Sequence, residues 1–108
     1  MIDRLDDIIA KYELEPLHNV HPGQVIDDVL VALGWTQTTL AGRSGMATGH
    51  LNRIIREHRD VTVEVAIKIE RATGITGLGL VLVRAMADHA YAREVAAGRS
   101  TTIPFSGT

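Results

Sequence analysis

Apolar side chains recur at helical spacing along most of the chain. Residues 2–14 place isoleucine, leucine and tyrosine on one side of a helix, with Asp and Lys opposite. The same period predicts helices over residues 22–33, 37–44, 48–56, 63–73 and 78–97. No stretch shows convincing strand alternation, and only residues 78–83 are ambiguous between strand and helix. We therefore expect an all-α fold without internal repeats.

Turn-forming and capping residues separate these segments. Pro22 suits a first helical turn, because the N–H that proline lacks has no partner there. Thr36 and Thr62 are placed to cap the helices that follow them. Glycines, which accept the left-handed conformation at a helix end, follow three of the segments, at Gly34, Gly45 and Gly74. The pattern divides the chain into an N-terminal helix and linker (1–20), a helical domain (21–97) and a tail (98–108) that we expect to be flexible.

Composition narrows the class of protein. With 108 residues the chain fits one compact domain, and its modest core would gain from a second subunit. The absence of cysteine excludes disulfides, thiolate metal sites and thiol nucleophiles. The acidic first residues do not resemble a signal peptide, and the longest apolar run is too short to cross a bilayer. We therefore expect a soluble, cytoplasmic protein.

The net charge of −2 is small, but acidic and basic residues are unevenly distributed along the chain. Residues 1–35 carry seven acidic side chains against two basic ones, whereas residues 36–59 carry four arginines against one glutamate. Binding to phosphate depends on the local field, so the basic stretch is compatible with DNA binding. An ordinary solvated surface explains the charges equally well.

One stretch has the spacing of a helix-turn-helix unit. Two helices that cross steeply need a small residue at their closest approach, which Ala41 supplies, and a turn residue that accepts positive φ, which Gly45 supplies. Leu51 and Ile54 would then anchor the second helix and leave its outer face free for the major groove of DNA. An ordinary helical hairpin explains the apolar positions, but not the joint placement of Gln37, Ala41 and Gly45 before an arginine-bearing helix.

About half of the chain, roughly residues 21–74, resembles the HigA-type antitoxins of the Xre, or lambda-repressor-like, helix-turn-helix family. The resemblance rests on His-Pro-Gly-Gln at 21–24, Gly-Trp-Thr-Gln-Thr-Thr-Leu-Ala at 34–41, Leu-Asn-Arg-Ile-Ile at 51–55 and Val-Thr-Val-Glu-Val-Ala at 61–66. It implies a five-helix lambda-repressor-like domain, here with an extra N-terminal helix and a long C-terminal helix. It also implies a homodimeric repressor that binds a palindrome in its own promoter and neutralises a RelE-like ribonuclease toxin.

The resemblance also assigns roles at the expected DNA interface. Contacts to the DNA backbone are expected from the start of the first motif helix and from arginines late in the second or beyond it: Thr36, Gln37, Arg56 and Arg59. Base contacts are expected from the outer face of the second helix, at Thr48, Gly49, His50, Asn52 and Arg53. In this arrangement Arg53 would pair with guanine and Asn52 with adenine.

Two departures from the family pattern weaken the expected base contacts. Ala47 stands where the family usually has serine, so we expect Thr48 to cap the second helix and to be less available to a base. Gly49 carries no side chain and lowers helix stability by about 1 kcal/mol relative to alanine. Base recognition should therefore depend mainly on His50, Asn52 and Arg53.

The last predicted helix is apolar around more of its circumference than one core requires. This favours burial on two sides, one against the domain and one against a second subunit. The expected dimer contacts are Leu78, Leu80, Val81, Leu82, Met86 and Tyr91. The alternative is the central helix of a monomer. Residues 78–83 also depart from the family pattern, so the resemblance guides this interface least.

Other candidate sites are weak. His18 and His21 have no third ligand at metal-binding spacing, which favours a surface or capping role. The adjacent Asp27 and Asp28 do not share a helix face for acid–base catalysis. Nucleophile motifs and phosphate-binding loops are missing from the sequence, so we expect no enzyme, cofactor or metal. The alternatives to an antitoxin are a phage or prophage repressor without a toxin, and a protein-interaction module that has lost DNA binding.

Overall fold

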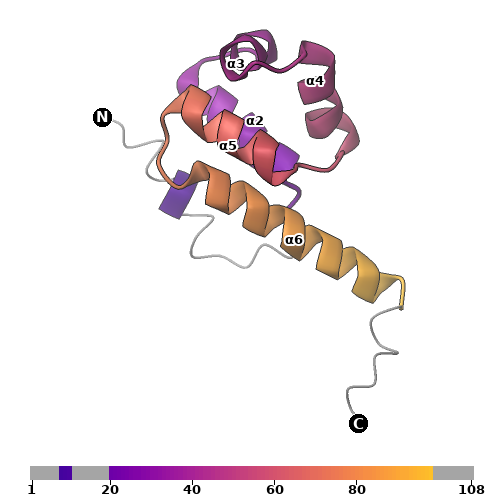
Figure 1. Cartoon of the computed structure of the whole chain (residues 1–108). Helices are drawn as coiled ribbons and strands as arrows, with labels where there is room; N and C mark the ends of the chain where they lie inside the picture. The colour runs from indigo at the N-terminus through magenta and orange to yellow at the C-terminus, as the bar shows by residue number, and fades with distance from the viewer. Residues whose placement is uncertain (1–7, 11–19, 99–108) are drawn as a thin grey trace.

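The computed structural model describes residues 8–10 and 20–98, and the regular elements in this part of the chain are helices (Figure 1). They are α2 (Pro22–Leu33), α3 (Gln37–Ser44), α4 (Thr48–Glu57), α5 (Val63–Thr73) and α6 (Leu78–Ala96). The described residues contain no strand, so residues 78–83 are helical. The predicted all-α fold is confirmed, and the boundaries predicted for these helices agree with the structure to within one residue.

The ends of the chain are described only in part. Residues 8–10 are helical, within the helix predicted over 2–14, and Ile8 and Ile9 pack against the core. The rest of that helix, the linker up to residue 19 with His18, and the tail beyond Gly98 lie outside the described residues. Within the described part, no helix is long and apolar enough to cross a membrane.

The capping residues predicted from the sequence lie where helices begin and end. Thr36 Oγ1 accepts a hydrogen bond from the amide of Thr39 (3.1 Å), and Thr62 Oγ1 accepts one from the amide of Val65 (3.2 Å). Three helices end at residues in the left-handed conformation, with φ of 71° to 75°, at Gly34, Gly45 and Gly74. These local signals explain why the boundaries could be predicted.

One apolar core joins the five helices. Each helix contributes fully buried large side chains, namely Ile26 from α2, Leu40 from α3, Leu51 and Ile54 from α4, Ile69 from α5, and Leu78 and Leu82 from α6. Figure 1 shows α5 lying alongside the first half of α6. The core therefore ties α3 and α4 to a scaffold made of the other helices.

α6 begins without a cap from its own side chains. Its N-cap residue is Gly77, and a carboxylate of α5 replaces the missing cap: Glu70 accepts hydrogen bonds from the amides of Gly79 (2.8 Å) and Gly77 (3.3 Å). A Cβ at Gly79 would lie 2.7 Å from Glu70 Oε1 and 3.3 Å from the Ala66 carbonyl oxygen. The two helices therefore approach closely at Gly79, and a larger residue there would displace the Glu70 carboxylate that caps α6.

The buried residues of α6 lie in its N-terminal half, and its C-terminal half extends beyond the other helices (Figure 1). Leu78, Val81 and Leu82, expected as dimer contacts, are at most 2% exposed and belong to the core of this chain. That part of the expectation is wrong, because apolar periodicity does not say which side of a helix faces its own domain. Leu80 and Tyr91 are 71% and 68% exposed, and Met86 is partly buried against the core.

Candidate nucleic-acid interface

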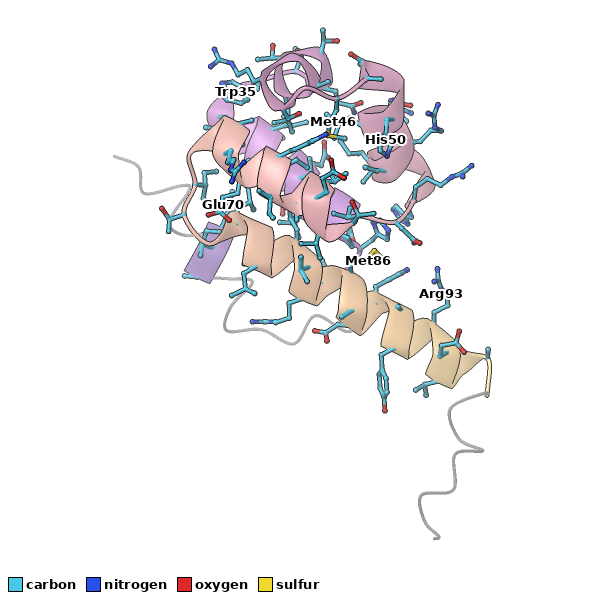
Figure 2. All side chains as sticks on the ribbon, in the orientation of Figure 1. Trp35, Met46, His50, Glu70, Met86 and Arg93 are labelled. Carbon is cyan, nitrogen blue, oxygen red and sulfur yellow. The ribbon has the colours of Figure 1, made fainter. Side chains whose placement is uncertain are left out.

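A short turn joins α3 to α4. Ala41 is buried, and its carbonyl accepts a hydrogen bond from the amide of Met46 (2.9 Å), which is labelled in Figure 2. Gly45 ends α3 with φ 75°, a conformation that strains other residues. The buried Ser44 hydroxyl donates to the Leu40 carbonyl (2.7 Å), so it is satisfied within α3. The turn therefore has the construction that the sequence predicted.

One side of α4 faces the core and the other faces solvent. Leu51 and Ile54 are fully buried. The outer face is exposed along the length of the helix, at Thr48, Gly49, His50, Arg53 and Arg56. Figure 2 shows His50 at α4. A helix anchored on one side with a polar, arginine-bearing outer face has the chemistry that suits the major groove of DNA.

The N-terminal end of α4 differs from the expectation. The N-cap residue is Ala47, with extended backbone (φ −71°, ψ 138°), and Thr48 is the first residue of the helix. The Ala47 carbonyl accepts from the amides of His50 (3.0 Å) and Leu51 (3.2 Å), but no side chain caps this end. The expectation that Thr48 caps α4 is therefore wrong. Its exposed side chain is not used as a cap.

Asn52 and Gln37, for which the sequence predicted separate roles, are linked by a hydrogen bond in the structure. Asn52 Nδ2 donates a hydrogen bond to Gln37 Oε1 (3.1 Å), and both side chains are half-buried. This bond links the first residue of α3 to the middle of α4. Asn52 keeps its second N–H and its Oδ1, which are the two groups that pair with adenine. Sequence reasoning missed the bond because 15 residues separate the partners.

Gly49 lies next to the Arg53 side chain. A Cβ built on Gly49 would lie 3.5 Å from one terminal nitrogen of Arg53, an ordinary contact distance, and would meet nothing else within 4 Å. The guanidinium therefore extends back along α4 toward its N-terminus. The position without a side chain is partly covered by the neighbouring arginine.

The four arginines of the basic stretch separate into two groups. Arg53, Arg56 and Arg59 are exposed on α4 and just after it, and the amide of Arg59 donates to the Arg53 carbonyl (3.4 Å). Arg43, at the end of α3, instead places its guanidinium 4.7 Å from the centre of the Trp35 ring, a cation–π contact. The local positive charge is thus concentrated at α4.

The sequence model of the family described as Helix-turn-helix matches residues 26–80, which span α3 and α4 and most of the core. The chain belongs to this helix-turn-helix family. Membership makes it a DNA-binding transcription regulator. No curated protein and no solved structure matches the chain.

Three histidines lie together at the C-terminal end of α4. His58 is the C-cap residue of α4 in the left-handed conformation (φ 53°), and its ring stacks on His21 with centroids 4.6 Å apart. His89 of α6 approaches the same His21 ring edge-on at 4.9 Å. We call His21, His58 and His89 the histidine cluster. It joins three segments of the helix-turn-helix protein that are distant in sequence.

The sequence predicted a surface or a capping role for His21. In the structure His21 is a capping residue, and it is buried. It is only 1% exposed, and its Nδ1 accepts a hydrogen bond from the amide of Gly23 (2.9 Å) at the start of α2. Its own amide donates to Gln24 Oε1 (3.1 Å), which completes a reciprocal cap. The His-Pro-Gly-Gln segment therefore forms a buried helix start.

Burial lowers the pKa of His21 from 6.5 to about 4, and the neighbouring His58 and His89 rings add to the shift. The His58 backbone and the Asp60 carboxylate act in the opposite direction. Burial also lowers the pKa of His89, with Arg93 as the second cause. Among the described residues no group of three His, Cys, Asp or Glu side chains is arranged to hold a metal ion. The lowered pKa values favour uncharged rings at His21 and His89.

Proposed function

We propose that the protein is a repressor that binds a palindromic operator as a homodimer, with α4 of each subunit in the major groove. The observation that carries this proposal is α4 itself, which is fully buried at Leu51 and Ile54 and exposed along a face with two arginines. A rigidly anchored helix with a polar outer face is what base recognition needs.

Base contacts are proposed for Thr48, Gly49, His50, Asn52 and Arg53. The uncapped start of α4 leaves the Thr48 hydroxyl available, which adds one polar group to the face. Arg53 supplies a planar donor pair for guanine, and Asn52 pairs with adenine while its other N–H stays on Gln37. Gly49 has no side chain to contact a base. At this position the helix backbone and the Arg53 guanidinium would approach the DNA instead.

Backbone contacts are proposed for Thr36, Gln37, Arg56 and Arg59. Thr36 and Gln37 lie at the N-terminal end of α3, where helix N–H groups favour a phosphate. Gln37 holds Asn52 through its Oε1, so its amide group is left to donate to the DNA backbone. Arg56 and Arg59 lie at the other end of α4 and add salt-dependent affinity.

DNA binding is tested on the duplex upstream of the coding region by fluorescence anisotropy at several salt concentrations. The double variant Asn52→Ala/Arg53→Ala is expected to lose more than tenfold in affinity, since each base contact contributes about 1–3 kcal/mol. Arg71→Ala, which removes an exposed arginine of α5, is the matched control and should bind nearly as the wild type does. Equal, salt-independent signals from all three proteins would rule out the repressor and favour a protein-interaction module.

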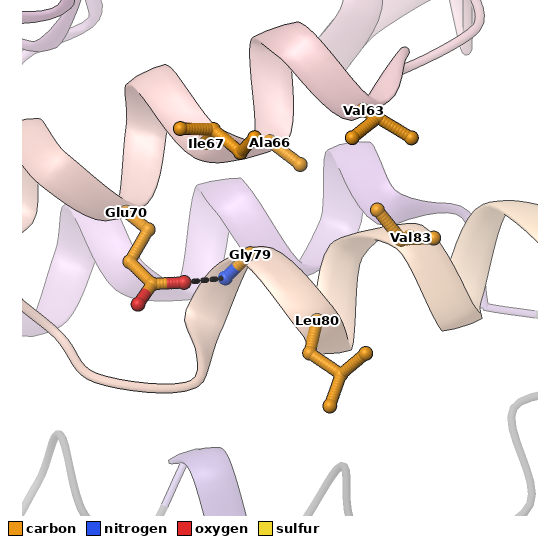
Figure 3. Close-up of a pocket in the computed structure, with 7 residues that line it drawn as sticks. All are labelled: Val63, Ala66, Ile67, Glu70, Gly79, Leu80 and Val83. Atoms are coloured by element: carbon orange, nitrogen blue, oxygen red, sulfur yellow. Dashed lines mark hydrogen bonds between the residues drawn. The ribbon is translucent and has the colours of Figure 1, made fainter.

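For the homodimer we propose an apolar surface on α5 and α6. A groove of about 310 Å³ between these helices is lined by Val63, Ile67, Leu80 and Val83 among others (Figure 3). Leu80 is 71% exposed beside the groove, so a two-fold axis would let each Leu80 enter the groove of the other subunit. Tyr91 is exposed on α6 and is proposed to extend this surface, whereas Met86, also expected at the dimer contact, is half-buried against the core and its Sδ accepts a hydrogen bond from the Val61 amide (3.3 Å).

Sedimentation tests this dimer. Leu80→Glu is expected to shift the protein to monomer, because a charge would be buried at the contact. Val31→Glu, at an exposed valine of α2 outside the groove, is the matched control and should leave the assembly unchanged. A wild-type protein that sediments as a monomer both alone and on DNA would contradict the proposal.

The biological role proposed is that of a HigA-type antitoxin, which represses its own operon and neutralises a ribonuclease toxin. Support comes from the resemblance over residues 21–24 and 61–66, and the first of these segments forms the reciprocal cap of α2. Co-expression with the neighbouring gene tests it: a small basic protein that copurifies with this chain and arrests growth alone supports an antitoxin. A repressor without such a neighbour is the phage-type alternative.

A further inference from the structure

The proposed base and backbone contacts do not include the residues of the histidine cluster. Its central ring is that of His21, the N-cap residue of α2, and the other two rings lie at the end of α4, the proposed recognition helix, and on α6. The start of α2 touches α4 directly as well: a Cβ on Gly23 would lie 2.7 Å from the Ile54 carbonyl oxygen and 3.1 Å from Ile55 Cα. The C-terminal end of α4 is therefore positioned against His21 and its cap.

The hydrogen bonds of His21 are compatible only with a neutral ring. Nδ1 accepts from the Gly23 amide, so the single ring proton must be on Nε2. Nε2 is buried and has no partner at hydrogen-bond geometry among the described residues. A second proton would have to bind Nδ1, which would remove the acceptor that caps α2. It would also place a charge within 5 Å of the centres of two other imidazole rings.

We infer that His21 and His58 are positioning residues for the recognition helix, and that protonation of His21 releases the C-terminal end of α4 and weakens DNA binding. This inference rests on the proposed DNA-binding function. His58 precedes Arg59 and follows the last turn of α4, so a change in its ring contact moves the segment that carries Arg56 and Arg59. The groups that face His21 are His58 at the end of α4, Asp60 in the following loop and His89 on α6, with Arg93 next to His89.

The direction of the pH dependence follows from the lowered pKa of His21. At neutral pH the ring is uncharged in the folded and in the unfolded chain, so stability is unaffected. Below pH 6.5 the unfolded chain binds a proton that the folded chain does not bind until about pH 4. Stability is therefore lost as the pH falls from about 6.5 to about 4, and the same holds for a local opening that exposes the ring.

The decisive variant is His21→Asn. Asparagine keeps a short side-chain acceptor at the N-cap position of α2 but does not titrate in this range. Between pH 7.5 and pH 5.0 the unfolding equilibrium constant of the wild type should rise roughly 30-fold more than that of His21→Asn. Thr62→Ala, which removes the N-cap acceptor of α5 but no titrating group, is the matched control and should keep the wild-type pH dependence of unfolding.

Two further measurements separate positioning from mere packing. In NMR spectra of DNA-free protein, the His21 ring should carry its proton on Nε2 at pH 7. The backbone amides of Gly23 and Arg59 should shift with the same midpoint as that ring. On the upstream duplex, the wild type should lose about twofold more affinity than His21→Asn on going from pH 7.5 to pH 4.0, where about half of the His21 rings are protonated.

The inference is overturned if His21 titrates at its ordinary pKa of 6.5 in the folded protein, if the Arg59 amide does not follow the ring, or if His21→Asn keeps the wild-type pH dependence of DNA binding. Failure of both proteins to bind the duplex at pH 7.5 would instead contradict the proposed function. In that case the NMR titration still decides whether the cluster positions the end of α4. Should His21→Asn fail to fold, the wild-type titration alone decides in the same way.

Discussion

The N-terminal end of α4 has no side-chain cap and an open position at Gly49, whereas its C-terminal end is packed against the start of α2 and stacked on a buried histidine. The two ends of one helix thus differ in how firmly they are held. The loosely covered end carries the proposed base contacts, and the packed end sets the position of the helix. Substitutions at the two ends should therefore change the free energy of unfolding by different amounts and in opposite directions.

The largest effect on stability is expected at Ile54, the buried residue that anchors α4 to the core. Ile54→Ala removes a fully buried side chain and should destabilise the protein by about 2–5 kcal/mol, through lost burial and the cavity that remains. Urea unfolding measures the change. Val31→Ala, at a 69% exposed valine of α2, is the control. Equal losses from the two variants would show that Ile54 does not anchor α4.

The next effect tests the packed end. Gly23→Ala places a methyl group 2.7 Å from the Ile54 carbonyl oxygen, so α2 and α4 must separate, and we expect a loss of about 1–3 kcal/mol. Urea unfolding again measures the free energy. Gly42→Ala in α3 is the matched control, because a Cβ there meets nothing within 4 Å, and alanine should stabilise that helix by up to about 1 kcal/mol. If both variants changed the free energy of unfolding in the same direction, the tight contact between α2 and α4 at Gly23 would be contradicted.

These contacts show where sequence reasoning succeeds. The helix boundaries could be predicted because local residues determine them: Thr36 and Thr62 cap within three residues, and glycines end three of the helices. The turn between α3 and α4 could also be predicted, because its small and flexible residues are required at fixed spacing. Only short-range geometry is involved in each case.

Long-range contacts explain what was missed. The histidine cluster joins residues 21, 58 and 89, and the cap of α6 comes from Glu70 on another helix. No periodicity brings such residues together. The position of Thr48 was missed for a different reason, since an N-cap and a first helical residue differ by one place and threonine is compatible with both. On α6, apolar residues lie on several sides of the helix, so the sequence does not indicate which of them form the core.

A cap can be added at the open end. Ala47 already has the extended backbone of an N-cap residue, so Ala47→Ser should accept a hydrogen bond from a first-turn amide and stabilise the protein by about 1 kcal/mol. Thermal unfolding measures the gain. Thr36→Ala, which removes the existing cap of α3, should give a loss of similar size. No gain from the serine would mean that the start of α4 is not limited by its missing cap.

The smallest effect comes from Gly49→Ala, and it compares the two ends most directly. The same methyl group that is costly at Gly23 should fit here, because its nearest neighbour is Arg53 at 3.5 Å, and we expect a gain of about 0.5 kcal/mol from the higher helix propensity of alanine. DNA affinity should not rise with stability, because the methyl group occupies space between the helix backbone and DNA. Urea unfolding and anisotropy on the upstream duplex measure the two quantities separately. If Gly49→Ala destabilised the protein as much as Gly23→Ala does, the N-terminal end of α4 would be as tightly packed as the other, and its exposure would not explain its proposed role in recognition.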